Sequence, residues 1–459
     1  MNKLLLLILA ASLAACGPKP KPVFDAGPDI DAGVDGGVDA GRMKGSEPVS
    51  GYSTALELPA GNGLSVRVGV SAAMALDQFG HPMIAAIYTD PNNDTFRIDD
   101  ALVFTRWNGL DKTLDGGTLG YQAPITVATV GEIDLTEPNR QVSISRDPVN
   151  GVIGIAYITD QKAVKIALST DEGLTWSPET VSLANASSHL LSNPTLVLND
   201  SVTHLAYFEA EALCGTIDCG QVVYRRRVGK GAFSDSMNPA PASPDVALAK
   251  PFSMAVDSAG NAGLAYFTGP PGAGAGSVSL LFWRPGSSPN KIADTAGAAL
   301  TKPASVSLTF SALLPRVAYH LPSSTSANAQ LWYAAATDAA GTGFTPVEIP
   351  RDFAGDVFEG TSTFQALAID SVGNVAIAAN HVGPSVNNGC RGGPKLARAT
   401  SGASFTTCRP EFPSDPVFGF AGQWISAAFH RTNKVTLAFT YETNSNPTIK
   451  GGVIVFRQP

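Results

Sequence analysis

The stretch Ala255-Val256-Asp257-Ser258-Ala259-Gly260, which leads to Ala265-Tyr266, contains the unit that decides the fold. A short apolar strand runs into an Asp-Gly turn, and a second strand then ends in Ala-Tyr. Another clear copy runs from Ala368-Ile369-Asp370 to Ala378-Ala379. Seven such second strands, spaced 69, 50, 59, 53, 60 and 60 residues apart, end at Tyr88, Tyr157, Tyr207, Tyr266, Tyr319, Ala379 and Phe439. Repeats of this length that are built from short strands predict a radial or solenoidal architecture.

Each unit continues with further strands of the same kind. In the second unit, Ala163 to Leu168 and Glu179 to Ala184 follow the strand that ends at Tyr157. Alternating or β-branched runs bounded by Gly, Pro, Asn and Asp are strand signals, and four antiparallel strands per unit are typical of a propeller blade. We therefore predict an all-β fold, a β-propeller of seven four-stranded blades. Six or eight blades are the alternatives, because the fifth unit lacks the Asp-Gly turn, and an open stack or a β-sandwich pair is a further one.

The last unit predicts how the ring closes. It stops after its third strand, at Pro459, whereas a spare strand, Ser53 to Leu58, precedes the first unit. We expect this N-terminal strand to pair with the strand Gly452 to Phe456 as the outer strand of the last blade. Such pairing ties both ends of the domain together and leaves no open sheet edge between the first and last blades.

One connection carries a family signature. Ser169-Thr170-Asp171-Glu172-Gly173-Leu174-Thr175-Trp176, between the third and fourth strands of the second unit, resembles the Asp box of the sialidase-like (BNR-repeat) β-propellers. In that turn the Asp accepts backbone N–H groups, the Gly supplies a positive φ, and the Trp packs between strands. Partial copies occur at Asp338 with Gly341 and at Gly402 with Phe405. The resemblance implies a structural role, away from the family's catalytic face, for Ser169, Asp171, Gly173, Thr175 and Trp176.

The N-terminus predicts export and a lipid anchor. Lys3 and an apolar run from Leu4 to Leu13 precede Leu13-Ala14-Ala15-Cys16, which resembles a bacterial lipobox. Residues 1–15 are thus expected to be a lipoprotein signal peptide, and Cys16 the site of acylation, including palmitate; an ordinary signal peptide is the alternative. Residues 16–50, with repeated Asp-Ala-Gly, are expected to be a disordered tether, and residues 51–459 the propeller domain. Gly17 favours the outer membrane of a Gram-negative bacterium, on the periplasmic or the outer surface.

Composition and cysteines limit the partners. The net charge is −8, and the basic cluster is Arg225 to Arg227, so nucleic-acid binding is not expected. The four remaining cysteines form two local pairs, which in an exported chain predict disulfides. Zinc is the competing interpretation, but Cys-x-x-Cys spacing and neighbouring histidines are missing. The predicted pairs are Cys214 with Cys219 and Cys390 with Cys408.

The long connections between second and third strands, such as Thr89 to Asp100 and Asn380 to Gly393, are expected to gather on one face and to carry function. The candidate ligand-face residues are Asp90, Arg97, Arg140, Asp160, Glu209, His320, Arg351, His381 and Glu442. Asp90, Asn92 and Asp94 have the spacing of a hard-cation site, so calcium is the one cofactor considered, although the EF-hand pattern fails at Thr95 and Ala101.

A sialidase would need three arginines, a Tyr-Glu nucleophile pair and an Asp acid/base. Phe96-Arg97-Ile98-Asp99 is similar to the family's Phe-Arg-Ile-Pro motif, but it lacks the Pro and lies in a loop. Tyr441-Glu442 is an ordinary candidate pair, and no catalytic residue can be assigned. The sequence therefore favours a non-catalytic, outer-membrane-anchored propeller that binds glycan or protein through the loop-rich face. A sialidase-like glycoside hydrolase, or another glycan-processing enzyme with a diverged site, is the alternative.

Overall fold

The structure is a computed structural model in which a large part of the chain is described. The described residues are 48–49, 52–56, 67–89, 101–107, 121–129, 142–159, 162–183, 191–210, 219–239, 247–269, 277–296, 305–320, 331–350, 357–358, 365–382, 393–400, 404–410, 418–443 and 451–458. Backbone contacts divide the chain into Met1–Arg42, which lies outside these ranges, and Met43–Pro459, which contains every described strand. Within the described ranges there is no helix with the length and apolar character needed to span a membrane.

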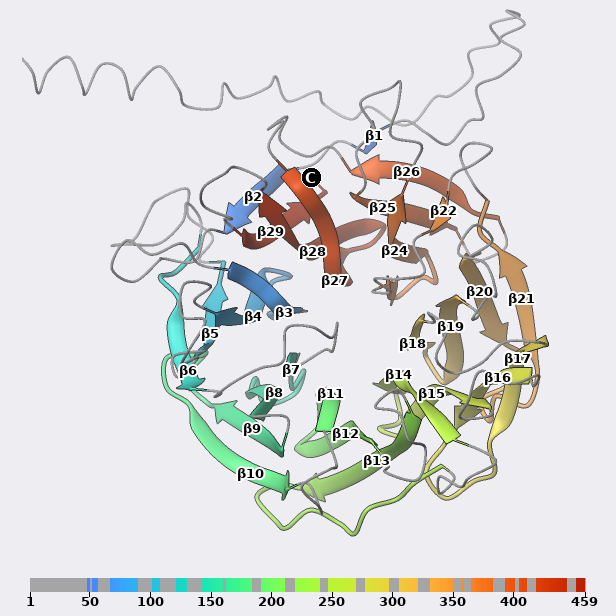
Figure 1. The fold of residues 1–459 in the computed structure, drawn as a ribbon, viewed down its shortest axis with the longest axis horizontal. Coiled ribbons are helices and arrows are strands. Elements are labelled where there is room, and N and C mark those ends of the chain that lie inside the picture. The colour runs from blue at the N-terminus through green and yellow to red at the C-terminus, as the bar shows by residue number, and fades with distance from the viewer. Residues whose placement is uncertain are drawn as a thin grey trace, which may run out of the picture. The chain divides into compact units, whose positions relative to one another are not determined.

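The strands form the seven antiparallel blades of a β-propeller (Figure 1), and in each blade the first strand lies innermost. Blade 1 consists of β3 (Arg67–Leu76), β4 (Pro82–Thr89), β5 (Ala101–Arg106) and β6 (Ile125–Thr129), and blade 2 of β7 (Val142–Arg146), β8 (Ile153–Thr159), β9 (Ala163–Ser169) and β10 (Ser177–Leu183). Blade 3 contains β11 (Leu191–Asn199), β12 (Val202–Ala210) and β13 (Cys219–Val228). Blade 4 consists of β14 (Ala247–Val256), β15 (Ala262–Gly269), β16 (Ser277–Trp283) and β17 (Asn290–Ala296). Blade 5 consists of β18 (Ser305–Ser311), β19 (Leu314–His320), β20 (Leu331–Ala336) and β21 (Phe344–Glu348). Blade 6 contains β23 (Gln365–Ile369), β24 (Val375–Val382), β25 (Gly393–Ala399) and β26 (Thr406–Pro410). Blade 7 consists of β27 (Phe418–Arg431), β28 (Lys434–Thr443), β29 (Gly451–Arg457) and β2 (Tyr52–Leu56).

Two blades depart from the simple pattern. In blade 3 the outer strand is an irregular segment, in which Met237 exchanges two backbone hydrogen bonds with Tyr224 and Ser234 donates one to Arg226. In blade 6 the short β22 (Val357–Phe358) pairs with β24 beyond the inner strand, and β1 (Pro48–Val49) lies parallel to β26. These additions lie at strand ends and edges, so they leave the four-strand plan of the blades intact.

The N-terminal strand closes the ring as predicted. β2 pairs antiparallel with β29, with Ser53 opposite Phe456 and Leu56 opposite Val453. Each inner strand is in contact with the next one around the ring, and β27 of the last blade is in contact with β3 of the first. The seven-blade prediction is confirmed, and the alternatives of six blades, eight blades, an open stack and a sandwich are excluded.

In the described part of the chain the core consists of seven apolar clusters, one between each pair of neighbouring blades. In blade 5, for example, Val317 and Tyr319 pack against blade 4, whereas Ala318 between them packs against blade 6. Successive side chains of a strand point to opposite faces of the sheet. Both faces of each blade are therefore buried, which explains why the landmark strands are apolar without a polar alternation.

The two ends of the blades differ, and we name them by their connections. The turn side holds the first-to-second-strand turns, at residues 77–81, 147–152, 200–201, 257–261, 312–313, 370–374 and 432–433. The loop side is the opposite end, where second-to-third and fourth-to-first connections leave the strands.

Aspartates tie neighbouring blades together on the turn side. The carboxylate of Asp147 accepts N–H groups of its own turn and, at 3.2 and 2.8 Å, the backbone N–H groups of Asp200 and Ser201 in the next blade. Asp370 likewise accepts the N–H of Asn433 in blade 7 at 2.8 Å. Burial raises the pKa of Asp147, but the backbone hydrogen bonds outweigh it and hold that pKa below its usual value.

Serines tie the inner strands of neighbouring blades in the same way. The hydroxyls of Ser145, Ser253 and Ser307 accept the backbone N–H groups of residues in the next inner strand at 2.9, 2.9 and 3.0 Å. Ser426 of the last blade accepts the N–H of Met74 in the first at 3.3 Å, across the point of closure. The inner ring is thus held by side-chain bonds between strands that share no ladder.

Candidate functional site

The loop side is the face on which the sequence placed its candidate residues, and its described part consists of the strand ends. Of the sequence-predicted residues, Asp90, Asn92, Asp94, Arg97, Arg140, Asp160 and Arg351 lie outside the described residues, as do Cys16, Cys214 and Cys390. The candidate residues that the structure describes on the loop side therefore lie at the ends of strands.

Glu209 lies within β12 rather than in a loop, because the ladder between β12 and β13 extends to Ala210. Its side chain is 5% exposed and accepts a hydrogen bond from Gln221 Nε2 at 3.3 Å. The Gln221 amide oxygen in turn accepts a hydrogen bond from Asn238. By strand alternation Glu209 shares a face with Tyr207, which packs against blade 2. Glu209 is thus part of a polar group within blade 3, at the loop end of the face that this blade turns toward blade 2.

His320 lies at the last position of β19 and is 2% exposed. Its Nδ1 lies 3.0 Å from the Ser305 hydroxyl, directly opposite in β18. Gln365 of blade 6 reaches across and donates to the carbonyl of Ala318. Burial lowers the pKa of His320 to about 4, against a smaller raising effect of its hydrogen bond with Gln365. The imidazole is therefore neutral at pH 7, which suits a structural hydrogen bond and not a general acid.

Lys395 joins this group from the third strand of blade 6. It lies opposite Ala379, which lies opposite Gln365, so all three face blade 5. The Lys395 side chain is 2% exposed. We name Ser305, His320, Gln365 and Lys395 the seam cluster, because they fill the loop end of the interface between blades 5 and 6. Buried polar groups of this kind fix the relative position of two sheets.

Sequence reasoning identified only His320 of this cluster. A two-residue turn at 312–313 is the signal that places Ser305 opposite His320, and Gln365 follows Ser305 by one repeat of 60 residues. The missing step was the exact turn length. Once the turn is fixed, pairing register follows from it.

The remaining candidates are placed by backbone register alone. His381 lies opposite Gly393 in blade 6, and Glu442 opposite Gly451 in blade 7, both near the loop side. Cys219 lies in β13 and Cys408 in β26. Their expected partners, Cys214 and Cys390, lie outside the described residues, so both disulfides stay predictions. Within the described ranges no three His, Cys, Asp or Glu side chains are grouped as a metal site.

The Asp-box turn lies on the turn side, between β9 and β10. Asp171 Oδ1 accepts the N–H of Thr175 at 2.9 Å and the hydroxyl of Ser169 at 2.8 Å, and Oδ2 accepts the Thr175 hydroxyl at 2.6 Å. These hydrogen bonds, with that of the Thr175 side chain first, lower the pKa of Asp171 to about 2. Gly173 has a φ of 89°, and a Cβ there would overlap the ring of Phe104 in blade 1.

The residue after this turn packs on the preceding blade. Trp176 meets Phe104 edge-on, with ring centroids 5.0 Å apart. In blade 5, Asp338 holds Thr342 as Asp171 holds Thr175, and Phe344 contacts Phe282 of blade 4. Phe405 of blade 6 contacts Tyr333 of blade 5 at 5.3 Å. The Asp-box turn therefore positions an aromatic bridge between blades, far from the loop side.

No protein-family model matches the chain, and no curated protein matches it. Among solved structures, the chain is similar to an α-L-arabinofuranosidase from Fusarium graminearum, at 10% identity and a TM-score of 0.47, over 89% of this chain and 98% of that one. It is also similar to a fucose-specific lectin from Aleuria aurantia, at 13% identity and a TM-score of 0.41, over 76% and 97%. A Trypanosoma rangeli sialidase has 12% identity and a TM-score of 0.43, over 76% and 57%. At such identities none of these names assigns an activity to this chain.

Proposed function

We propose that this chain is a lipoprotein of a bacterial outer membrane whose propeller binds a glycan or a protein through the loop side, without catalysing a reaction. The observation that carries the proposal is the difference between the two ends of the blades. On the turn side, short turns are joined to their neighbours by aspartates such as Asp147 and Asp370. The second-to-third-strand connections on the loop side, such as residues 90–100, 321–330 and 383–392, are longer than these first-to-second-strand turns and unlike one another. Variable connections on a fixed scaffold are how folds build recognition surfaces.

The described strand ends support this role by holding the loop side in place. The seam cluster joins blades 5 and 6 at the loop ends of their strands, and Glu209 is held by Gln221 at the loop end of blade 3. Their burial favours a supporting function for them over direct contact with a ligand. We therefore propose that the ligand meets the charged residues of the connections and the adjoining strand ends: Asp90, Arg97, Arg140, Asp160, Arg351, His381 and Glu442.

Binding through the loop side is tested with the full chain in detergent solution on a glycan array, and by crosslinking to envelope proteins. Two variants replace residues 322–329 or 384–391 by Gly-Ser linkers of equal length. The matched control is Val149→Ser, a substitution at an exposed turn-side residue. We expect the linker variants to lose binding by at least about tenfold and the control to keep it. Binding that survives both replacements, or turnover of a panel of aryl glycosides by the unmodified chain, would contradict the proposal.

The anchor rests on Leu13-Ala14-Ala15-Cys16 and is tested separately. Acylation needs the thiol of Cys16, so Cys16→Ser should move the protein from the membrane to the soluble fraction, or leave its signal uncleaved. Labelling with radioactive palmitate should disappear in the same variant. Unchanged fractionation and processing would remove the anchor from the proposal while leaving the binding face untouched.

A further inference from the structure

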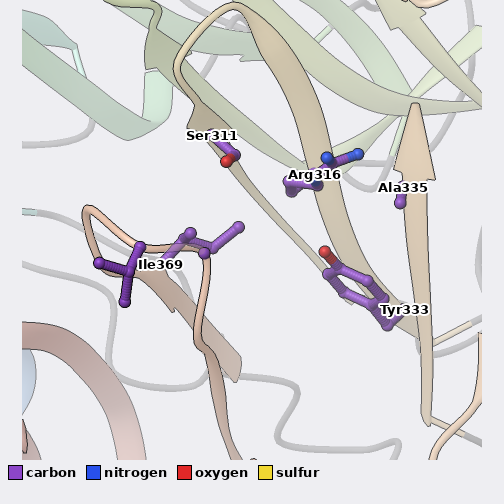
Figure 2. A pocket seen from close by; sticks show the side chains of 7 residues that line it. Ser311, Arg316, Tyr333, Ala335 and Ile369 are labelled. Carbon is purple, nitrogen blue, oxygen red and sulfur yellow. The ribbon is translucent and has the colours of Figure 1, made fainter. Parts of the chain in front are cut away.

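A small cavity lies at the turn end of the interface between blades 5 and 6 (Figure 2). Its volume is about 230 Å³. Blade 5 contributes Ser311, Arg316, Tyr333 and Ala335, and blade 6 contributes Ile369, Val372 and Gly373. It lies on the side of the molecule opposite the proposed glycan- or protein-binding face.

The cavity lies where an interblade aspartate is replaced. In blades 2 and 6 the turn aspartate reaches the backbone of the next turn, at Ser201 and at Asn433. The corresponding turn of blade 5 is Ala312-Leu313, with no carboxylate. The carbonyls of these two residues accept hydrogen bonds from Ser258 and Arg284 of blade 4 instead. The interface with blade 6 is therefore left open at this end.

The polar groups around the cavity are donors. Arg316 donates through Nη1 to the carbonyl of Ala336 at 2.8 Å, and no described carboxylate lies within ion-pair distance of its guanidinium. By contrast, Arg106, Arg227 and Arg284 are each paired with a carboxylate. A guanidinium carries five N–H donors, so most of those of Arg316 remain for another acceptor.

Two residues that carry hydroxyls, Tyr333 and Ser311, line the same cavity as Arg316. Tyr333 is 2% exposed, and Figure 2 shows its hydroxyl turned toward the side of the cavity that Ser311 lines. Burial raises the pKa of Tyr333, an effect that the nearby Arg316 partly opposes, so the phenol remains a donor at pH 7. Ile369, Val372 and Ala335 form the apolar part of the wall. One cation and two hydroxyls beside an apolar wall match an anionic group on a compact apolar body.

We propose that this cavity is a binding site for a small monocarboxylate, held by Arg316 with hydrogen bonds from Tyr333 and Ser311. The volume is below the 300–1,000 Å³ typical of sites for larger ligands, and leaves room for on the order of eight non-hydrogen atoms. A free organic acid or the acidic group of a larger molecule offers the same chemistry. The former fits inside, whereas the latter would have to enter past Val372, which is 66% exposed.

The proposal is tested by titrating the full chain with benzoate and with its neutral isostere benzamide, followed by saturation-transfer NMR and calorimetry. A ligand of this size is expected to bind with a Kd of about 1 mM. Benzamide should bind at least about tenfold more weakly, because it carries no charge for Arg316. Acetylated glutamate in a short peptide serves as the probe for an acidic group on a larger molecule; binding of the peptide alone would overturn the proposal of a small free acid.

Three variants separate the site from general effects. Arg316→Gln should weaken benzoate binding by about tenfold or more, whereas Arg146→Gln, an arginine of the same side bonded to Gln78, should not change it. Ala335→Leu fills the cavity without removing a polar group, so it should abolish benzoate binding. This variant tests the same site if Arg316→Gln does not fold. Equal affinity for benzoate in the unmodified chain and in Ala335→Leu, or no saturable binding at about ten times the expected Kd, would overturn the proposal.

Discussion

At the scale of single residues, the carboxylate of Asp147 joins two blades by hydrogen bonds, as backbone pairing joins strands within a blade. It accepts four backbone N–H groups, two from its own turn and two from the turn of the next blade, and is itself 2% exposed. The two turns belong to different sheets and share no strand pairing. A buried acceptor that serves several donors is costly to remove, because each donor loses its partner without regaining water.

Asp147→Ala is therefore expected to lower the free energy of unfolding by about 2–4 kcal/mol. The measurement is urea unfolding at pH 7. Asp235→Ala is the matched control, because Asp235 is an exposed aspartate of the same blade pair; it should change stability by less than about 0.5 kcal/mol. Equal effects of the two substitutions would show that the hydrogen bonds of Asp147 do not join the blades.

Buried histidines make stability depend on pH. Burial, as the largest cause, lowers the pKa of His204 and of His320 to about 4, whereas an unfolded histidine titrates near 6.5. Below pH 6.5 the unfolded chain binds more protons than the folded one, so stability falls as pH drops toward 4 and is fully present above 6.5. The slope is at most about 1.4 kcal/mol per pH unit for each histidine.

His320→Gln should flatten this slope by the share of one histidine, and a further His204→Gln substitution by another. Unfolding free energies measured between pH 4 and pH 7 provide the comparison. The slope, and not the absolute stability, is the relevant quantity, since the substitution also disturbs the hydrogen bond with Ser305. A slope unchanged in both variants would mean that these imidazoles bind protons in the folded protein as readily as in the unfolded chain.

At the scale of elements, the Asp-box turn shows why its glycine is needed. Gly173 and Gly229 both have positive φ, but only at Gly173 would a Cβ meet another blade, at the Phe104 ring. Gly229→Ala should therefore cost about 1 kcal/mol, from backbone strain alone. Gly173→Ala should cost about 3 kcal/mol, because overlap with Phe104 is added.

Thermal and urea unfolding of the two alanine variants measure this difference. A second substitution, Phe104→Leu, should bring the cost of Gly173→Ala closer to that of Gly229→Ala, since it gives the methyl group room. If both glycines tolerate alanine equally well, the turn does not press on blade 1 as described.

The repeat pattern predicted these elements well where its signals are local. The landmark strands, the Asp-Gly turns and the position of the Asp box depend on neighbouring residues, so they could be read from one unit at a time. The ends of strands were harder to predict from the sequence. Glu209 was expected in a loop, but pairing with Gln221 in the neighbouring strand keeps it in β12. The strand propensity of one segment does not show how far the neighbouring strand extends alongside it.

Contacts between blades were beyond the sequence pattern. Ser307 meets the N–H of Leu367 sixty residues later, and Ser145 meets that of Leu198 after 53 residues. Because insertions change the spacing from unit to unit, no fixed interval identifies such pairs. The cavity between blades 5 and 6 could not be predicted from the repeat pattern for the same reason. The loss of the Asp-Gly turn in the fifth unit was visible, but its effect on the next blade was not.

At the scale of the whole molecule, the closed ring is the premise of every proposal made for this protein. The seven apolar clusters lie between blades, so each blade depends on both neighbours for its core. Blade 7 obtains its outer strand from the N-terminal end of the domain, through five residue pairs from Tyr52 opposite Arg457 to Leu56 opposite Val453. Loop-side binding and the turn-side cavity both require that this ring hold its blades in fixed positions.

Deleting residues 51–60, compared with deleting residues 20–45, tests this claim most directly. The first deletion removes β2 and leaves the edge of β29 unpaired, so it should lower stability by about 3–5 kcal/mol and promote association through the exposed edge. The second shortens the expected tether and should leave melting temperature and solution size unchanged. Melting curves and size-exclusion chromatography of both variants report the outcome. Equal melting temperatures, with both variants monomeric, would contradict closure of the ring by the N-terminal strand.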